Sequence, residues 1–385
     1  MEVKPGYKQT ETGIIPEDWR IQSIEQISTV GRGRVISHRE IARSLNPRYP
    51  VYSSQTSDNG VMGYLDTFEF EGEYITWTTD GANAGTVFAR NGRFNCTNVC
   101  GTIKLKSDNP LFVAKVLGKI APRHVSRHLG NPKLMNDVMK RIKIPLPPTK
   151  AEQEAIAEAL SDADALIESL EQLLSKKCEL KQGAMQELLT GKKRLTGFSG
   201  KWEVRRLGSV LKFQVGFPFS SVFFNEKGQG IRLVKNRDLK SDDQVFCYSG
   251  NFGQEFLVRN GDVLAGMDGD FLPCLWAKGP ALLNQRVGRS VVLAGLDILL
   301  AFYYLLAPLQ ETENVTSCTT VKHLSHRDIE GIEKPLPTIL EQTAIAAILS
   351  DMDAEIAALE AKLAKARDLK QGMMQELLTG RIRLV

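Results

Sequence analysis

The chain has 385 residues, of which 42% are hydrophobic and 24% charged, and a formal net charge of +4. No apolar stretch approaches the roughly 18 residues of a membrane-spanning helix, and no apolar run follows the first charges, so we expect a cytoplasmic protein without a secretory signal. Its six cysteines form no zinc-type C-x2-C pair, which favours free thiols, and its length predicts two or three domains.

Residues 1–148 form the first predicted domain and carry a net charge of +6. Three segments show strand-like alternation with Gly and Asn turns, and an apolar helical run follows at Leu111–Ile120. The three segments are Tyr49–Gln55, Glu73–Gly81 and Gly101–Lys106. A mixed α and β block of this size can bury a core of its own, so we expect an independent domain.

Basic side chains gather in this domain in a pattern typical of nucleic-acid binding. Between Lys119 and Lys143 there are seven Lys or Arg residues, two His residues and one acid, Asp137. Phosphate contacts need several cations on one surface, and turns that follow strands can reach into a groove. The candidate DNA contacts are therefore Arg32, Arg34, His38, Arg39, Arg43, Thr79, Asn83, Arg123, His124, Arg127, His128 and Lys133. A solvated basic face is the alternative, and because His124 and His128 could share a metal only on a helix, we expect no metal site.

Residues 149–196 are predicted to form a long helix. Thr149 and Glu152 have the T-x-x-E spacing of a capping box, and Gly191 is a helix stop. The helix should span about 40 residues, or roughly 60 Å at 1.5 Å per residue. Apolar residues recur with 4,3 spacing, which indicates a coiled-coil seam. The seam residues are Ile156, Leu160, Ala163, Ile167, Leu170 and Leu174.

Residues 197–334 form a second predicted domain, with a net charge of +1 and a layout like that of the first. Strand-like segments are Gly230–Asn236, Gly261–Gly269 and Gly288–Leu293, and a helical run follows at Leu296–Leu309. Cations would hold phosphates here, and Asn and Gln side chains could read adenine edges. The candidate DNA contacts are Arg232, Lys235, Asn236, Arg237, Asp268, Asn284, Gln285, Arg286 and Lys322. The turns at Thr78–Gly81 and Met267–Asp270 fall at comparable places, either as groove-reading turns or as hairpins.

Residues 335–385 repeat the central helix. Thr338–Leu384 matches Thr149–Leu195 at a constant offset of 189, with 29 of 47 positions identical. The second seam is Ile345, Leu349, Met352, Ile356, Leu359 and Leu363. We therefore expect an α+β fold in which two pseudo-symmetric α/β domains are separated by two long antiparallel coiled-coil helices. Gly183 and Gly372 occupy matching helix positions, and since glycine costs about 1 kcal/mol there, they favour a kink or a close helix approach.

Motifs for catalysis are incomplete in this sequence. Asn46-Pro-Arg-Tyr49 lacks the second proline of the adenine methyltransferase motif N-P-P-[YF], and Gly31–Arg34 lacks the third glycine of a dinucleotide fingerprint. No G-x-x-x-x-G-K-[ST] phosphate loop occurs. We expect a chain that is not an enzyme and binds no cofactor itself.

The doubled element L-K-Q-G-x-M-Q-E-L-L-T-G, preceded by E-Q-x-A-I-A and followed by R-L, resembles the specificity (S) subunits of type I restriction-modification enzymes. The opening PGYKQTETGIIPEDW and the segments LLNQRVGRSVV and TTVKHLSHRDI extend this resemblance over the whole chain. It implies two target-recognition domains, each reading one half of a split, asymmetric site in double-stranded DNA. The repeat helices would act as a spacer between the half-sites.

The resemblance also implies protein partners. The repeat helices would dock methyltransferase (M) subunits, expected to be two, which bind S-adenosylmethionine and methylate adenine at N6. Restriction (R) subunits of the full complex would use ATP and Mg for translocation and cleavage, and we expect no membrane contact. The alternative is a coiled-coil scaffold with two protein-binding domains that touches no DNA; it would keep the helices but would not need the basic residues.

Overall fold

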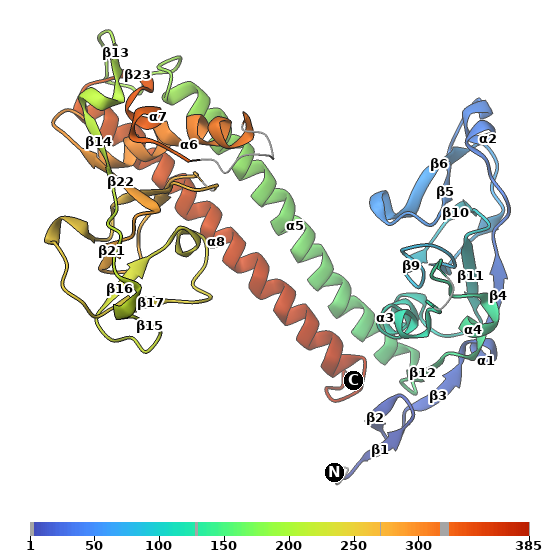
Figure 1. The fold of residues 1–385 in the computed structure, drawn as a ribbon. Coiled ribbons are helices and arrows are strands. Elements are labelled where there is room, and N and C mark those ends of the chain that lie inside the picture. The colour runs from blue at the N-terminus through green and yellow to red at the C-terminus, as the bar shows by residue number, and fades with distance from the viewer. Residues whose placement is uncertain (1–3, 128–129, 270, 316–322, 385) are drawn as a thin grey trace. The chain divides into compact units, whose positions relative to one another are not determined.

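The computed structural model describes residues 4–127, 130–269, 271–315 and 323–384 (Figure 1). They form two compact units, which we describe separately. Unit 1 is Met1–Glu171 with Lys362–Val385, and unit 2 is Gln172–Ala361. Each unit therefore combines one predicted domain with part of both long helices. No helix among the described residues is long and apolar enough to cross a membrane.

Unit 1 is built on two four-stranded sheets, in the orders β4-β11-β8-β9 and β6-β5-β10-β7. The first is antiparallel and packs against α3, whereas β5 and β10 of the second run parallel. Trp19, Trp77 and Phe112 are fully buried in its main core. The strands are β1 (Tyr7–Thr10), β2 (Gly13–Pro16), β3 (Arg20–Ser23), β4 (Ser28–Arg32), β5 (Tyr49–Tyr52), β6 (Val61–Leu65), β7 (Phe70–Glu71), β8 (Tyr74–Thr78), β9 (Val87–Arg90), β10 (Arg93–Cys96), β11 (Cys100–Leu105) and β12 (Lys143–Leu146). The helices of its block are α1 (Ile24–Ile27), α2 (His38–Arg43), α3 (Pro110–Ile120) and α4 (Asn136–Arg141).

Unit 2 has the same plan. Its antiparallel sheet has the order β14-β22-β19-β20, and its second sheet, β15-β17-β16-β21-β18, contains the parallel pair β16 and β21. The strands are β13 (Glu203–Arg206), β14 (Leu211–Val215), β15 (Phe224–Asn225), β16 (Ile231–Val234), β17 (Phe246–Tyr248), β18 (Leu257–Val258), β19 (Val263–Gly266), β20 (Cys274–Leu275), β21 (Ala281–Leu283), β22 (Val287–Val292) and β23 (Glu333–Leu336). The helices of its block are α6 (Ile298–Val315) and α7 (His326–Glu330).

The two blocks share one framework although their sequences differ. The antiparallel sheets correspond strand by strand, α3 corresponds to α6, and a two-stranded sheet, β12-β3 or β13-β23, precedes each long helix. All six predicted strand segments contain a strand and both predicted helical runs form helices, so the pseudo-symmetric α/β prediction is confirmed. The hairpin β1-β2 belongs to unit 1.

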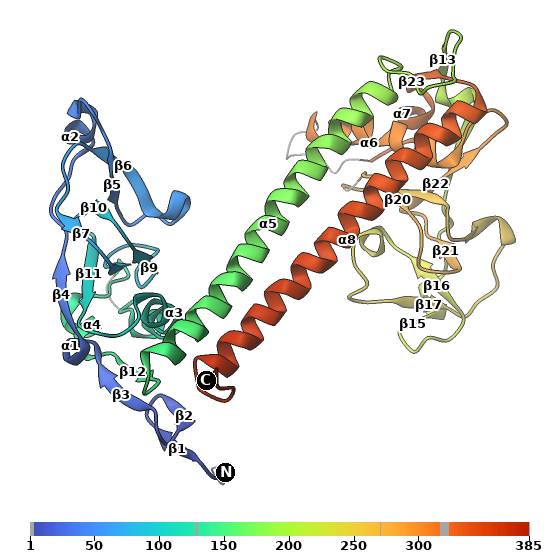
Figure 2. The ribbon, with the colours of Figure 1, turned by 180° about the vertical axis from the view of Figure 1, so that it is seen from behind.

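The two repeats form helices of 39 residues each, α5 (Lys150–Leu188) and α8 (Ile339–Leu377), close to the predicted length. Within each unit they lie side by side, as Figures 1 and 2 show. Ion pairs fix their direction: the residue number falls on α8 as it rises on α5, so the helices are antiparallel. The pairs are Asp164 with Lys370 and Glu171 with Arg367 in unit 1, and Lys177 with Glu355 and Lys181 with Asp353 in unit 2.

The seam residues are all buried or half-buried. Ile156 and Leu160, near the start of α5, join the main core of unit 1, and Ile345 and Leu349, near the start of α8, join that of unit 2. Each long helix is therefore anchored at its beginning in the block that precedes it.

Two local predictions about these helices are confirmed only in part. The Thr149 hydroxyl accepts from the Glu152 amide as in a capping box, but the Glu152 carboxylate accepts from Arg383 instead of closing the box. Of the two alternatives predicted at Gly183 and Gly372, a close helix approach is absent, since a Cβ atom at either position would meet nothing within 4 Å, and a kink stays a prediction. The cysteines of the described residues are free thiols, as predicted, and Cys318 lies outside those residues.

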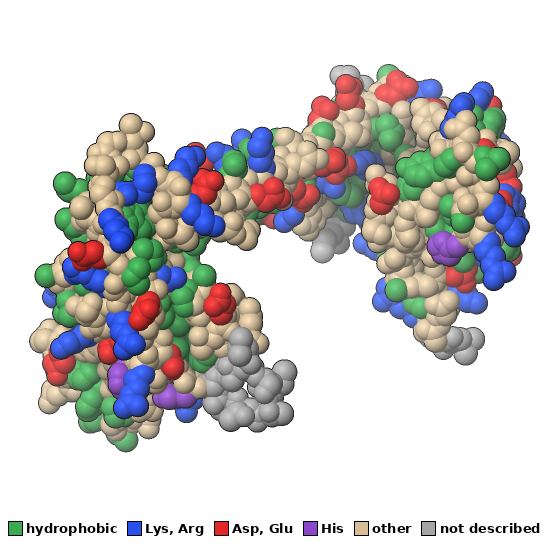
Figure 3. Space-filling model, turned by 90° about the horizontal axis from the view of Figure 1, so that it is seen from above, with side chains coloured by type: hydrophobic (Ala, Val, Ile, Leu, Met, Phe, Trp, Pro, Cys, Tyr) green, Lys and Arg blue, Asp and Glu red, His purple; other side chains and the backbone are tan. Residues whose placement is uncertain are grey.

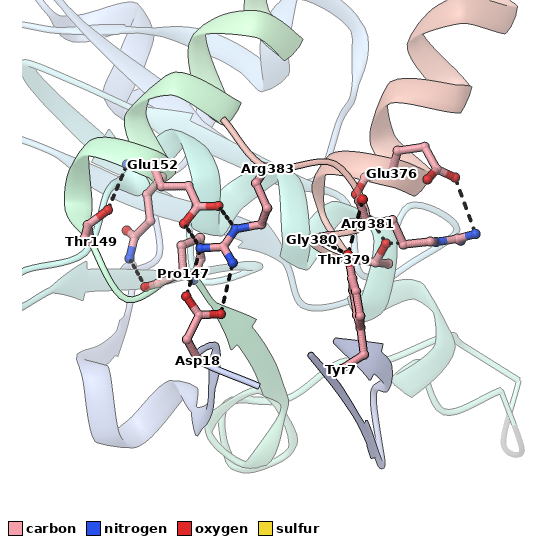
Figure 4. Close-up of polar contacts among 11 residues, drawn as sticks. Tyr7, Asp18, Pro147, Thr149, Glu152, Glu376, Thr379, Gly380, Arg381 and Arg383 are labelled. Carbon is pink, nitrogen blue, oxygen red and sulfur yellow. Dashed lines mark hydrogen bonds and ion pairs between the residues drawn. The ribbon is translucent and has the colours of Figure 1, made fainter. Parts of the chain in front are cut away.

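Glu152 and Glu341 instead form two equivalent clasps. Each carboxylate is 1% exposed and accepts two hydrogen bonds from an arginine at the end of the other repeat, Arg383 or Arg194. Figure 4 shows the first clasp, in which Arg383 also donates to Asp18 at 3.0 and 2.9 Å. The clasp explains why Glu and Arg recur in both repeats: the start of each helix is sealed by the end of the other.

Candidate nucleic-acid interface

An Asp-Gly turn follows the same sheet strand in both units. Asp80 and Gly81 follow β8, and Asp268 and Gly269 follow β19; both glycines have a left-handed backbone, with φ of +97° and +82°. The backbone of each turn pairs with the segment after α3 or α6, at Lys133 or His323. The predicted comparable turns therefore occupy equivalent positions.

The aspartates of these turns form ion pairs with residues that are predicted to contact DNA. Asp80 accepts a hydrogen bond from Thr79 at 2.7 Å and pairs with Arg32 at 3.3 Å and Lys133 at 3.8 Å. Asp268 pairs with Arg286 at 2.9 Å and contacts His323 at 2.8 Å. The structure thus brings Arg32, Thr79 and Lys133 together in unit 1, but their charge is partly neutralised by an acid.

Other predicted cations are held in ion pairs inside their own unit. Arg34 donates to Glu40 and Glu69, and these hydrogen bonds raise its pKa. Arg232 pairs with Asp242 and lies over the Trp276 ring, 5.1 Å from the centroid. Both guanidinium groups are therefore already paired within the folded unit and are not free to contact phosphate.

A second group of predicted residues in unit 1 is exposed and has no hydrogen-bond or ion-pair partner among the described residues. These residues are His38, Arg39 and Arg43 on α2 and Arg123, His124 and Arg127 after α3. Asn83 instead donates to the Ser54 carbonyl oxygen at 3.2 Å, and His128 lies outside the described residues. His124 ends a 3-10 turn and is followed by extended backbone at Val125, so no helix continues from His124.

Five of the nine predicted residues of the second domain line one hollow of about 460 Å³. It is lined by Lys235, Asn236, Arg237, Gln244, Phe246, Asn284 and Arg286. The Lys235 ammonium lies 3.1 Å from the centroid of the Phe246 ring, and burial together with Arg237 lowers its pKa. Asn236 donates one N–H to the Asp268 carbonyl oxygen at 2.7 Å, and its Oδ1 is buried without a hydrogen-bond partner among the described residues, so the amide does not present the donor and acceptor that an adenine edge requires. Gln285 is exposed beside this hollow, and Lys322 lies outside the described residues.

Phe217 is an exposed residue that our reading of the sequence missed. Gly33 and Gly216 follow β4 and β14 and donate to equivalent carbonyls at 3.1 Å, which makes Arg34 and Phe217 equivalent. The Phe217 side chain is 46% exposed. In the sequence, the equivalence of Arg34 and Phe217 is indicated by a glycine before each of them, directly after a strand. It can be recognised only after the strands of the two blocks have been aligned.

Charge on the surface is mixed. On the face shown in Figure 3, Lys and Arg side chains are interspersed with Asp and Glu side chains on each unit. Contacts to phosphate would therefore depend on particular unpaired cations. Within the part of the chain that the structure describes, no three His, Cys, Asp or Glu residues are grouped to hold a metal ion.

The family model for the type I restriction modification DNA specificity domain matches residues 16–177 and 199–366. The chain belongs to this family and contains two copies of its domain. Membership implies that the chain works with DNA and with other subunits of a type I restriction-modification complex.

Known relatives agree with this assignment. A Mycoplasma pneumoniae chain, named as the N-terminus of a type I specificity subunit, is 46% identical over 140 residues, 36% of this chain and 73% of that one. The EcoBI specificity subunit of Escherichia coli is 33% identical over 193 residues, 49% of this chain and 41% of that one. The crystal structure of a type I S subunit from M. genitalium matches with a TM-score of 0.68 and 15% identity, over 97% of this chain and 98% of that chain, which shows a common fold.

Proposed function

We propose that this chain is a non-catalytic subunit that gives a type I complex its DNA sequence specificity. Each block reads one half of a bipartite, asymmetric site, and α5 with α8 sets the spacing between the halves. The observation that carries this proposal is one framework used twice with different side chains at equivalent positions, such as Arg34 and Phe217. Two related readers with different surfaces suit two different half-sites.

The exposed cations supply the phosphate contacts in this proposal. Arg39 and Arg43 on α2 and Arg123 and Arg127 after α3 are unpaired among the described residues. Unpaired Lys and Arg side chains release counterions on binding DNA, which makes affinity fall steeply with salt. A scaffold protein that does not bind DNA would not need these unpaired cations.

Two equivalent places on the long helices are proposed docking positions for methyltransferase subunits. Leu180 and Leu369 are 51% and 60% exposed and lie one turn from Gly183 and Gly372, above which the space is open. A side-chain-free glycine beside an exposed leucine lets a partner helix come close. Because the element occurs twice, we propose two M subunits for each chain.

The chemistry in this proposal belongs to the partners. S-adenosylmethionine would bind the M subunits, and ATP and Mg the R subunits, so the assembled complex would be an adenine-N6 DNA methyltransferase and an ATP-dependent endonuclease. This chain supplies the choice of site.

Co-expression with the M subunits of its system tests the proposal. Sequencing that detects N6-methyladenine should find one bipartite motif methylated, with two different half-sites and a fixed gap. Methylation that is independent of this chain, or no binding of the complex to DNA containing the motif, would contradict it and favour the scaffold.

A further inference from the structure

We propose that Phe217 is a specificity-determining residue that reads the 5-methyl group of one thymine in the half-site of the second block. This inference rests on the proposed function. It assigns a base contact to a residue that offers neither charge nor hydrogen bond.

The backbone holds Phe217 firmly in place. Its amide donates to the Leu283 carbonyl oxygen at 2.9 Å, and its carbonyl oxygen accepts from the Gln285 amide at 3.1 Å. Gly216 allows this approach, since a Cβ atom there would lie 2.1 Å from the Asn284 carbonyl oxygen. Phe217 and Asn284 also form a parallel bridge, and bridged residues point to the same side of a sheet. The ring therefore emerges beside an amide side chain.

The ring is rigid and only half covered. Phe219 and Phe256 pack against it with centroid distances of 5.2 and 5.1 Å, while 46% of the side chain remains exposed. When a ligand covers an aromatic side chain that is already ordered, the burial of apolar surface makes the free energy of binding more favourable, and little side-chain entropy is lost. The exposed part of the ring is thus suited to a binding contact.

The surroundings favour DNA as the ligand. Asn284 is bridged to Phe217 and half-buried, and Gln285 donates its amide to the Phe217 carbonyl oxygen and is exposed, so two amide residues flank Phe217, whereas the Arg286 guanidinium is paired with Asp268 at 2.9 Å. An apolar side chain beside amide groups matches the edges of bases in the major groove, where thymine presents a methyl group and an acceptor. A side chain that wedges between base pairs must project most of its ring, and Phe217 keeps half of its ring covered.

The equivalent position in the first block is closed. Arg34 is held by Glu40 and Glu69, so this place offers a neutralised ion pair instead of an apolar surface. The inference therefore assigns this contact to the second block alone, which fits two half-sites that differ in sequence.

Deoxyuridine, which lacks the 5-methyl group, tests the contact. The full chain, assembled with its M subunits, is titrated with duplexes in which each thymine of the recognition site is replaced singly by deoxyuridine. Wild-type complex should bind one of these duplexes about fourfold more weakly, as expected for one buried methyl group. Phe217→Ala should abolish this difference, and Phe217→Leu should retain part of it.

Phe223→Ala is the matched control, because Phe223 is also 46% exposed in unit 2 and packs on Tyr248. It should keep the wild-type response, and thermal unfolding of each variant checks that the fold is intact. The inference is overturned if no thymine responds to the replacement, or if the same thymine still responds in Phe217→Ala. If wild-type complex binds no sequence preferentially, the proposed function itself fails, which is a separate result.

Discussion

Arg383, near the end of the second repeat, donates to both carboxylate oxygens of Glu152, at the start of the first. Glu152 is 1% exposed, so its charge depends on this partner for compensation. Arg194 and Glu341 make the same contact in the other unit, at 2.6 and 2.7 Å. Each compact unit thus uses the end of one repeat to seal the beginning of the other.

Loss of this arginine should destabilise unit 1. Arg383→Met leaves Glu152 buried without a cation, and breaking such a pair costs about 3 kcal/mol. Urea unfolding measures the change. Arg205→Met is the control, because Arg205 and Glu203 are both exposed and exposed pairs contribute about 0.5 kcal/mol. Equal effects of the two substitutions would show that the clasp is not a stabilising contact.

Removal of the turn acid in unit 1 should strengthen nonspecific DNA binding. Asp80→Asn releases Arg32 and Lys133 to contact phosphates, and each new contact steepens the plot of log affinity against log salt by about 0.9. Asp137→Asn changes the net charge equally but involves an 85% exposed acid whose one ion-pair partner among the described residues is Lys140. Fluorescence anisotropy over a salt series should give a steeper slope for Asp80→Asn than for this control; identical slopes would argue against the release of cations.

The cations after α3 should contact phosphate and not bases. Arg123→Ala combined with Arg127→Ala should weaken binding to all duplexes and lower the salt slope by about 2, without altering sequence preference. Arg205→Ala combined with Arg206→Ala removes the same charge from residues already paired with Glu203 and Glu333, and should change the slope little. A changed preference at one base pair with an unchanged slope would make Arg123 and Arg127 base readers.

The exposed leucines of the repeats should control the number of docked M subunits. Leu180→Lys or Leu369→Lys alone should leave one M subunit bound, and the double variant none, because a buried unpaired ammonium disfavours either interface. Native mass spectrometry of the co-expressed complex counts the subunits. Lys176→Ala, an exposed change on α5, serves as the control. Two M subunits on the double variant would place docking elsewhere.

The sequence predicts some features better than others, for physical reasons. The repeat, the two 39-residue helices and the strands follow from local periodicity, which depends on near neighbours. Whether an arginine is free or ion-paired does not follow from local periodicity. Arg34 pairs with Glu69, and Arg232 with Asp242, through contacts that form only when the chain folds. Glu152 was misjudged for the same reason, since its partner, Arg383, is 231 residues away.

The spacer role of the two helices is tested most directly by lengthening both of them. Seven residues inserted after Leu174 in α5 and after Leu359 in α8 keep the heptad register and lengthen each helix by about 10 Å at 1.5 Å per residue. Mapping of N6-methyladenine in cells that express this variant with its M subunits should show both half-sites unchanged and the gap widened by about 3 base pairs, because base pairs are stacked about 3.4 Å apart. Altered half-sites with the original gap would contradict the account.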